Sequence, residues 1–201
     1  MWQGTSMKNL LIIDNYDSFV YNVPQVIARN HDIKYEVVRN DRLNDQHFSI
    51  SKYSHVVLSP GPGNPTNPKD FGRCLDVIDH FRSKVPILGI CLGHQGIAAY
   101  HGAVIDTAKK IQHGLTSEIK LIGNCPLFYG LSSLTVMRYH SLVVKSGTLP
   151  SYFQLTAVTD DEDEEIMAYN NIDHGLYAVQ FHPESIATLS GGKILSNFIN
   201  I

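Results

Sequence analysis

Short apolar runs recur along the first half of the chain and predict buried strands. These runs occupy residues 10–13, 35–38, 55–58 and 85–90. Helices are predicted between or after them, over residues 19–30, 70–82 and 92–100. The apolar residues that share one face of the second helix are Phe71, Leu75, Ile78 and Phe81. That face is expected to pack on a sheet. Alternating strands and helices predict a parallel sheet with a ligand site at the carboxyl ends of its strands.

Two polar residues and a proline add detail to the prediction of the first helix. Asp17 or Ser18 is predicted to cap the helix over residues 19–30. Pro24 is expected to bend that helix or to remove one of its hydrogen bonds.

After Gly102 the pattern changes to shorter pieces without clear helical periodicity. Strands are predicted over residues 118–122, 134–137, 142–145, 153–158, 166–169 and 176–181, with a turn at 173–175 and a closing helix over 192–199. The acidic run over residues 160–165 is predicted to be a solvated turn. The expected fold class is therefore α/β: an open, mostly parallel sheet flanked by helices, with additional short antiparallel strands.

Composition narrows the function classes. With 201 residues, 43% of them apolar, and a net charge of −3, the sequence predicts one globular domain over residues 7–201. No nucleic-acid or membrane partner is indicated. Residues 1–6 are interpreted as a tag or a disordered N-terminus. Three widely spaced cysteines argue against a disulfide framework and favour a reducing, cytoplasmic location. Two of them, Cys74 and Cys125, are interpreted as small apolar residues.

The third cysteine lies between glycines, in the segment Gly89-Ile90-Cys91-Leu92-Gly93. A buried strand ends there and a predicted helix begins, so Cys91 is expected at a sharp strand-to-helix turn. The partial positive charge of a helix N-terminus favours a thiolate. The pattern predicts a nucleophile elbow with sulfur in place of the serine hydroxyl, although a buried structural cysteine between two glycines fits the same short pattern.

Two further motifs supply what a cysteine nucleophile needs. His182 and Glu184 flank Pro183 after the last predicted strand, and residues two apart on an extended backbone point the same way. A histidine oriented by a carboxylate is the base half of a nucleophile–base–orienter triad. The Pro/Gly-rich loop over residues 59–65 follows a strand at the same sheet edge. The N–H groups of Gly61 and Leu92 are therefore predicted to form a two-donor oxyanion hole.

These three motifs, in this order, resemble the class I glutamine amidotransferases, and the resemblance spans residues 10–198. The segments 14–19, 138–142 and 181–185 are similar to those of the glutaminase subunits of anthranilate synthase and aminodeoxychorismate synthase. The resemblance implies a flavodoxin-like fold with Cys91 as nucleophile, His182 as general base and acid, and Glu184 as its orienter. It also implies a set of residues that bind glutamine and the oxyanion: Gly61, Pro62, Gly63, Leu92, Gln95, Ser141 and Leu142.

The implied reaction is hydrolysis of L-glutamine to glutamate and ammonia. The resemblance implies that the ammonia passes to a separate chorismate-binding synthase subunit, which makes anthranilate for tryptophan, 4-amino-4-deoxychorismate for folate, or both. No cofactor is expected on this chain, and Mg²⁺ and chorismate are expected on the partner. His94 and His140 are interpreted as packing groups. His101 and Leu115 stand where family members commonly carry glycine and lysine, which leaves the details of coupling to the partner open.

Two other functions remain open from the residues. One is a γ-glutamyl hydrolase or cysteine peptidase of related fold, and Gln95 and the 59–65 loop argue against it. The other is a non-catalytic binding subunit, and the presence of Cys91, His182 and Glu184 argues against it.

Overall fold

A computed structural model describes residues 7–201, so the interpretation of residues 1–6 falls outside the described residues. The strands are β1 (Lys8–Asp14), β2 (Ile33–Arg39), β3 (His55–Leu58), β4 (Ile87–Ile90), β5 (Ile105–Leu121), β6 (Leu134–Val144), β7 (Gln154–Thr159), β8 (Ile166–Asn171) and β9 (Leu176–Val179). The α-helices are α1 (Asn22–Ala28), α2 (Pro68–Phe71), α3 (Cys74–Phe81), α4 (Leu92–Tyr100) and α5 (Gly191–Ile199), and short 3₁₀ turns are η1 (Asp45–Phe48), η2 (Ile50–Lys52), η3 (Pro126–Phe128) and η4 (Ile172–His174).

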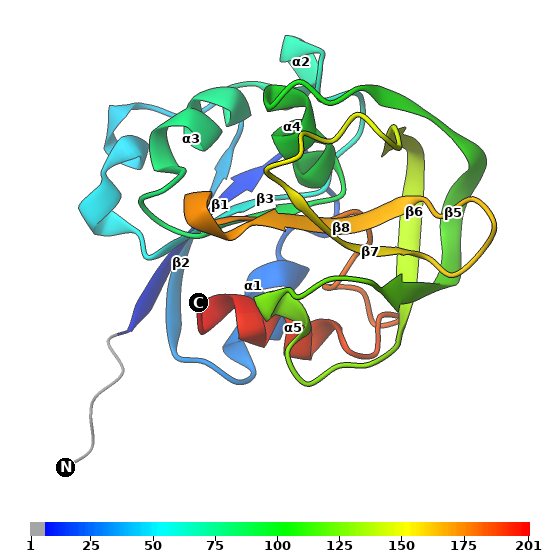
Figure 1. The fold of residues 1–201 in the computed structure, drawn as a ribbon. Coiled ribbons are helices and arrows are strands. Elements are labelled where there is room, and N and C mark those ends of the chain that lie inside the picture. The colour runs from blue at the N-terminus through cyan, green and yellow to red at the C-terminus, as the bar shows by residue number, and fades with distance from the viewer. Residues whose placement is uncertain (1–6) are drawn as a thin grey trace.

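Within the described chain the strands form one nine-stranded sheet in the order β2-β1-β3-β4-β9-β8-β7-β5-β6. Strands β2, β1, β3, β4 and β9 pair in parallel, as the alternating pattern predicts. Helices α1 and α5 cover one face of this half and α3 and α4 the other (Figure 1). Both faces are therefore apolar, and alternate residues of β1 enter different cores: Leu10 packs with α1 and α5, and Leu11 with α3 and α4.

The remaining strands extend the same sheet in antiparallel fashion. Strand β5 has 17 residues and pairs with both β6 and β7, so these strands are not uniformly short as expected. The two pieces predicted at 134–137 and 142–145 are one strand, β6. The sequence hides this continuity because Arg138 and His140 point inward, where an apolar residue is expected.

The prediction of one continuous helix over residues 70–82 is wrong. Gly72, with φ of +51°, breaks it into α2 and α3. The break changes which positions of α3 face the core. Leu75 is 41% exposed, whereas Cys74 and Val77 are buried together with Ile78. The predicted apolar face is therefore correct at Phe71, Ile78 and Phe81 and wrong at Leu75.

The first helix begins later than predicted. Residues 19–21 form a turn, and α1 starts at Asn22. The Asp17 carboxylate accepts a hydrogen bond from the Phe19 N–H at 3.1 Å, so it caps this turn rather than the helix. Pro24 lies in the first turn of α1, where its missing N–H costs no intrahelical hydrogen bond.

The acidic run forms the turn between β7 and β8, as expected, and several of its carboxylates form ion pairs. Asp163 binds Lys109 and Lys110 at 2.8 and 3.2 Å, and Glu165 turns inward to Arg138. None of the described helices has the length and apolarity needed to cross a membrane.

Candidate active site

Cys91 lies between β4 and α4, at the nucleophile elbow that the sequence predicts. Its φ of 52° and ψ of −102° are unusual for a residue with a side chain and mark local backbone strain. The turn is tight because a Cβ atom on Gly93 would lie 2.3 Å from the Leu58 carbonyl oxygen. Only glycine at position 93 allows α4 to start this close to β3, and α4 then presents its first N–H groups beside Cys91.

The sheet brings the histidine–carboxylate pair to Cys91. Strands β4 and β9 are parallel neighbours, and the Cys91 N–H donates to the Val179 carbonyl at 2.9 Å. The chain leaving β9 then places His182 beside Cys91. Its Nδ1 lies 2.6 Å from Glu184 Oε1, and both side chains are buried. His182 Nε2 has no hydrogen-bond partner among residues 7–201, so it is free for proton transfer.

The electrostatics favour a charged imidazole. Burial disfavours the charge, but Cys91 and Glu184 outweigh it and raise the pKa of His182 well above 6.5. Protonated His182 therefore places a positive charge beside Cys91. The thiolate is the reactive form of cysteine. The Tyr139 ring packs edge-on against the His182 ring, with centroids 5.3 Å apart, and limits its rotation.

A cavity of about 730 Å³ opens over Cys91 and His182. Gly61 belongs to its wall, as expected for an oxyanion donor, and Leu92 is the first residue of α4. Neither the Gly61 nor the Leu92 N–H has an acceptor within the described part of the chain. Both donors are therefore unpaired near Cys91, which fits the predicted two-donor oxyanion hole.

The other predicted binding residues are placed unevenly. The residues that do not line this cavity are Pro62, Gly63, Gln95, Ser141 and Leu142. A Cβ on Gly63 would lie 2.4 Å from the Asp70 carboxyl carbon. The close approach of Asp70 and the φ of +92° already require glycine at this position. Gln95 is buried and donates to the Leu142 carbonyl at 2.8 Å. Ser141 precedes Leu142 on β6 and is exposed. The binding roles of these residues stay predictions.

Sequence reasoning missed Gln180, whose side-chain nitrogen lies 3.7 Å from Cys91 Sγ. The available signal was a single glutamine within the otherwise apolar run 176–181. His94 and His140 are buried, as their interpretation as packing groups requires. Burial lowers the pKa of each to about 3. Burial also raises the pKa of the Cys74 thiol and, to a smaller degree, that of Cys125.

Buried neutral histidines make stability fall in acid. The pKa of His94 in the folded protein is about 3, below the ordinary 6.5, so the unfolded chain binds the proton more tightly. Stability is fully present above pH 6.5 and is lost as pH falls toward 3, by about 1.4 kcal/mol per pH unit for each such histidine. His182 has the opposite sign: its raised pKa adds stability below pH 6.5, which is lost as pH rises through the folded value.

Replacing His94 with methionine is therefore expected to flatten the acid limb. Both ring nitrogens of His94 lack partners within residues 7–201, so the substitution breaks no hydrogen bond of that ring. Between pH 7.5 and 5, the variant is expected to lose about 2 kcal/mol less unfolding free energy than the wild type. Urea unfolding at both pH values measures this difference, and equal losses in the two proteins would contradict it.

The fold and site together define the class of protein. A parallel sheet that presents a cysteine at a strand-to-helix elbow, faced by a histidine–carboxylate pair, is the arrangement of α/β enzymes that use a cysteine for acyl transfer. Sequence comparison is more specific. The family described as glutamine amidotransferase class-I matches residues 11–201, and the chain belongs to this family.

Individual relatives agree. The chain is 45% identical to the bifunctional protein TrpGD of Thermotoga maritima over 98% of its own length, and it spans 33% of that longer protein. It is 44% identical to anthranilate synthase component 2 of Saccharolobus solfataricus, covering 96% of this chain and 99% of the relative. It is 43% identical to aminodeoxychorismate/anthranilate synthase component 2 of Bacillus subtilis, covering 94% and 95%.

A solved structure has the same fold. A putative GMP synthase protein from Thermoplasma acidophilum superposes with a TM-score of 0.82 at 27% sequence identity, covering 96% of this chain and 93% of the other.

Residues 7–201 contain no cluster of three or more histidine, cysteine or acidic side chains suited to a metal ion.

Proposed function

We propose that this chain hydrolyses L-glutamine and supplies the ammonia to a chorismate-using synthase component. The observation that carries the proposal is the meeting of Cys91 with the His182–Glu184 pair at one cavity, in a chain of the glutamine amidotransferase family. The names of the relatives from S. solfataricus and B. subtilis support a synthase component that makes anthranilate, aminodeoxychorismate or both. The described cysteines are free, which fits the proposed cytoplasmic location.

The residues support a two-stage reaction. The Cys91 thiolate attacks the side-chain amide carbon, and the carbonyl oxygen becomes an oxyanion that the Gly61 and Leu92 N–H groups bind. Protonated His182 gives its proton to the nitrogen as the C–N bond breaks, which releases ammonia and leaves a γ-glutamyl thioester. Water then attacks the thioester, His182 takes the water's proton, and cleavage of the C–S bond releases glutamate. One oxyanion donor typically lowers such a barrier by about 3 kcal/mol.

In this reaction the thiol and imidazole do the chemistry, so the proposal includes no metal or organic cofactor on this chain.

The hydrogen bonds of the Gln95 side chain limit what it can bind. Both N–H groups of its amide are used, one by Leu142 and one by Gln180 at 3.0 Å, so it offers a ligand only its oxygen. That oxygen suits the α-ammonium group of glutamine.

The rim of the cavity indicates where the synthase component docks. Four large side chains at the cavity are exposed although apolar or aromatic: Phe19, Tyr139, Ile186 and Leu189. Ile186 and Leu189 are 96% and 87% exposed, which is unfavourable for a surface that meets only water. A partner seated on this rim closes the cavity and receives ammonia directly.

Glutamate release tests the proposed function. We expect release from glutamine to be weak for the chain alone and to rise when a chorismate-using synthase component and chorismate are added. Activation by the anthranilate-forming component alone assigns a tryptophan role, by the aminodeoxychorismate-forming component alone a folate role, and by both a shared role. If no glutamate is released with either component, the proposal is contradicted and the hydrolase or binding alternatives are favoured. A panel of γ-glutamyl and peptide substrates then separates these two.

Replacing Ile186 with aspartate is expected to weaken the complex. A charge placed at the centre of an apolar contact typically costs on the order of 2 kcal/mol, or about thirtyfold in Kd. Ile172→Asp is the matched control, because Ile172 is 50% exposed in η4 and does not line the cavity. Titration of the synthase component, with glutamate release as the signal, measures both affinities. Equal Kd values for the two variants would place the docking surface elsewhere.

A further inference from the structure

Gln180 contacts the proposed nucleophile directly. It follows β9, its side chain is completely buried, and its Nε2 lies 3.7 Å from Cys91 Sγ within hydrogen-bonding geometry. A glutamine amide presents either a donor or an acceptor to such a neighbour, depending on which way it is turned. The surrounding hydrogen bonds decide which of the two faces the sulfur.

The Leu142 carbonyl fixes this orientation, because a carbonyl oxygen only accepts. It binds Gln95 Nε2 at 2.8 Å, so the NH₂ group of Gln95 must face Leu142. The same NH₂ group donates its second hydrogen to Gln180 Oε1 at 3.0 Å. The oxygen of Gln180 is thereby used, and its own NH₂ group is left to face Cys91. The sulfur is offered a donor and not an acceptor.

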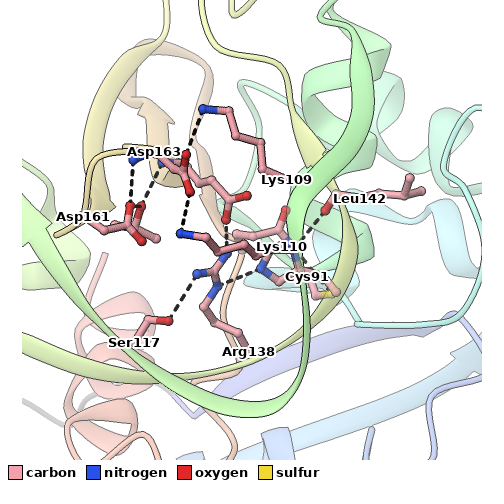
Figure 2. A network of polar contacts seen from close by, with 12 residues as sticks. Cys91, Lys109, Lys110, Ser117, Arg138, Leu142, Asp161 and Asp163 are labelled. Carbon is pink, nitrogen blue, oxygen red and sulfur yellow. Dashed lines mark hydrogen bonds and ion pairs between the residues drawn. The ribbon is translucent and has the colours of Figure 1, made fainter.

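The Leu142 carbonyl is itself held from a second side. Arg138 Nε can only donate, and it donates to His140 Nε2 at 3.0 Å. His140 therefore carries its hydrogen on Nδ1, which lies 3.1 Å from the Leu142 oxygen. Arg138 is fully buried, pairs with Glu165 and binds the Ser117 hydroxyl at 3.2 Å. Figure 2 shows Arg138, Ser117, Cys91 and Leu142 in one network of polar contacts.

We propose that the Gln180 amide is a catalytic group that stabilises the thiolate of Cys91 by donating an N–H to its sulfur, with Gln95 and Leu142 as the positioning residues that fix its orientation. This inference rests on the proposed function only for its consequence in catalysis. A hydrogen bond to a charged acceptor is stronger than one to the neutral form, so this donor favours the thiolate over the thiol.

The other groups around the sulfur come from four elements. His182 after β9, Tyr139 on β6 and the N-terminus of α4 lie beside it, and Glu184 after β9 and Asp17 after β1 line the same cavity. The Tyr139 carbonyl, 3.9 Å from Sγ, is an acceptor that suits the thiol, and the Gln180 donor suits the thiolate formed when the proton moves to His182. A substitution at Gln180 removes none of these groups.

Replacing Gln180 with methionine tests the proposal, because it keeps the length of the side chain and removes the donor. The rate of Cys91 alkylation by iodoacetamide is measured as a function of pH on the intact chain, with the modified peptide quantified by mass spectrometry. We expect the midpoint of the pH profile to rise by about one unit and the rate at pH 7 to fall about tenfold. The exposed Gln46→Met is the matched control and is expected to follow the wild type.

The readout separates this inference from a structural role and from the proposed function. A damaged site is alkylated slowly at every pH. If only thiolate stabilisation is lost, the difference in alkylation rate from the wild type is expected to disappear at high pH, where Cys91 is a thiolate in both proteins. Coincident profiles for wild type and a folded Gln180→Met would overturn the inference. Gln180→Asn, which keeps the amide but withdraws it from the sulfur, gives the same comparison if the methionine variant does not fold. Absence of glutaminase activity in the wild type would overturn the proposed function and leave the alkylation result standing.

Discussion

Cys91→Ser is expected to lower glutamate release by the complex with the synthase component by about 10⁴-fold or more. The serine hydroxyl fits the elbow, but it is a far weaker acid than a thiol, and the proposed reaction needs an anionic nucleophile beside His182 and Gln180. The remaining groups, the oxyanion donors among them, are retained. The decrease in glutamate release therefore measures the contribution of the cysteine nucleophile alone.

Two controls accompany this variant. Thermal unfolding is expected to stay close to the wild type, because serine is slightly smaller than cysteine and position 91 is only 5% exposed. Product formation by the complex from added ammonium salt is expected to be retained, because the synthase component then needs no glutamine. Glutamate release within tenfold of the wild type would show that Cys91 is not the nucleophile.

Gly191→Ala is expected to destabilise the protein by about 3 kcal/mol and to reduce glutamate release about a hundredfold. A Cβ at this first position of α5 would lie 1.9 Å from the Pro183 carbonyl oxygen. Pro183 links His182 to Glu184, so the backbone shift that relieves the clash moves both. Urea unfolding and glutamate release with saturating synthase component measure the two effects.

The neighbouring glycine supplies the matched control. A Cβ on Gly192 has 3.7 Å to the Val26 side chain, an ordinary contact. Gly192→Ala is expected to keep full stability or gain up to about 1 kcal/mol, because alanine is the better helix former. If both alanine variants unfold at the same urea concentration, the close approach of α5 to Pro183 does not constrain the site.

The local patterns of the sequence identified the parallel half of the fold and the residues of the proposed triad. The apolar runs at β1, β3 and β4 are short and uninterrupted because both faces of those strands are covered by helices. The elbow at Cys91 could be predicted because the glycine-flanked cysteine at a strand end is joined later in the chain by His182 and Glu184; the short pattern alone also fits a buried structural cysteine. The end of β9 was readable because His182 and Glu184 flank a proline.

The antiparallel half was harder to predict, and for a physical reason. Its strands bury polar side chains: Arg138 and His140 lie inside β6 and satisfy each other and Glu165. A pattern of apolar positions cannot identify a strand whose interior is held by hydrogen bonds and an ion pair. The break at Gly72 was missed for a related reason, since it depends on a distant residue: a Cβ on Gly72 would lie 2.8 Å from the Asn40 side chain.

By itself, then, the sequence determined which residues form the proposed triad and which strands hold them, because backbone turns and buried strands depend on neighbours along the chain. Only the tertiary structure decided how those residues face one another. It placed His182 beside Cys91 through the pairing of β9 with β4, and it turned the Gln180 amide toward the sulfur through Gln95 and Leu142. Such orientations depend on contacts between residues distant in the chain, and a one-dimensional pattern does not record them.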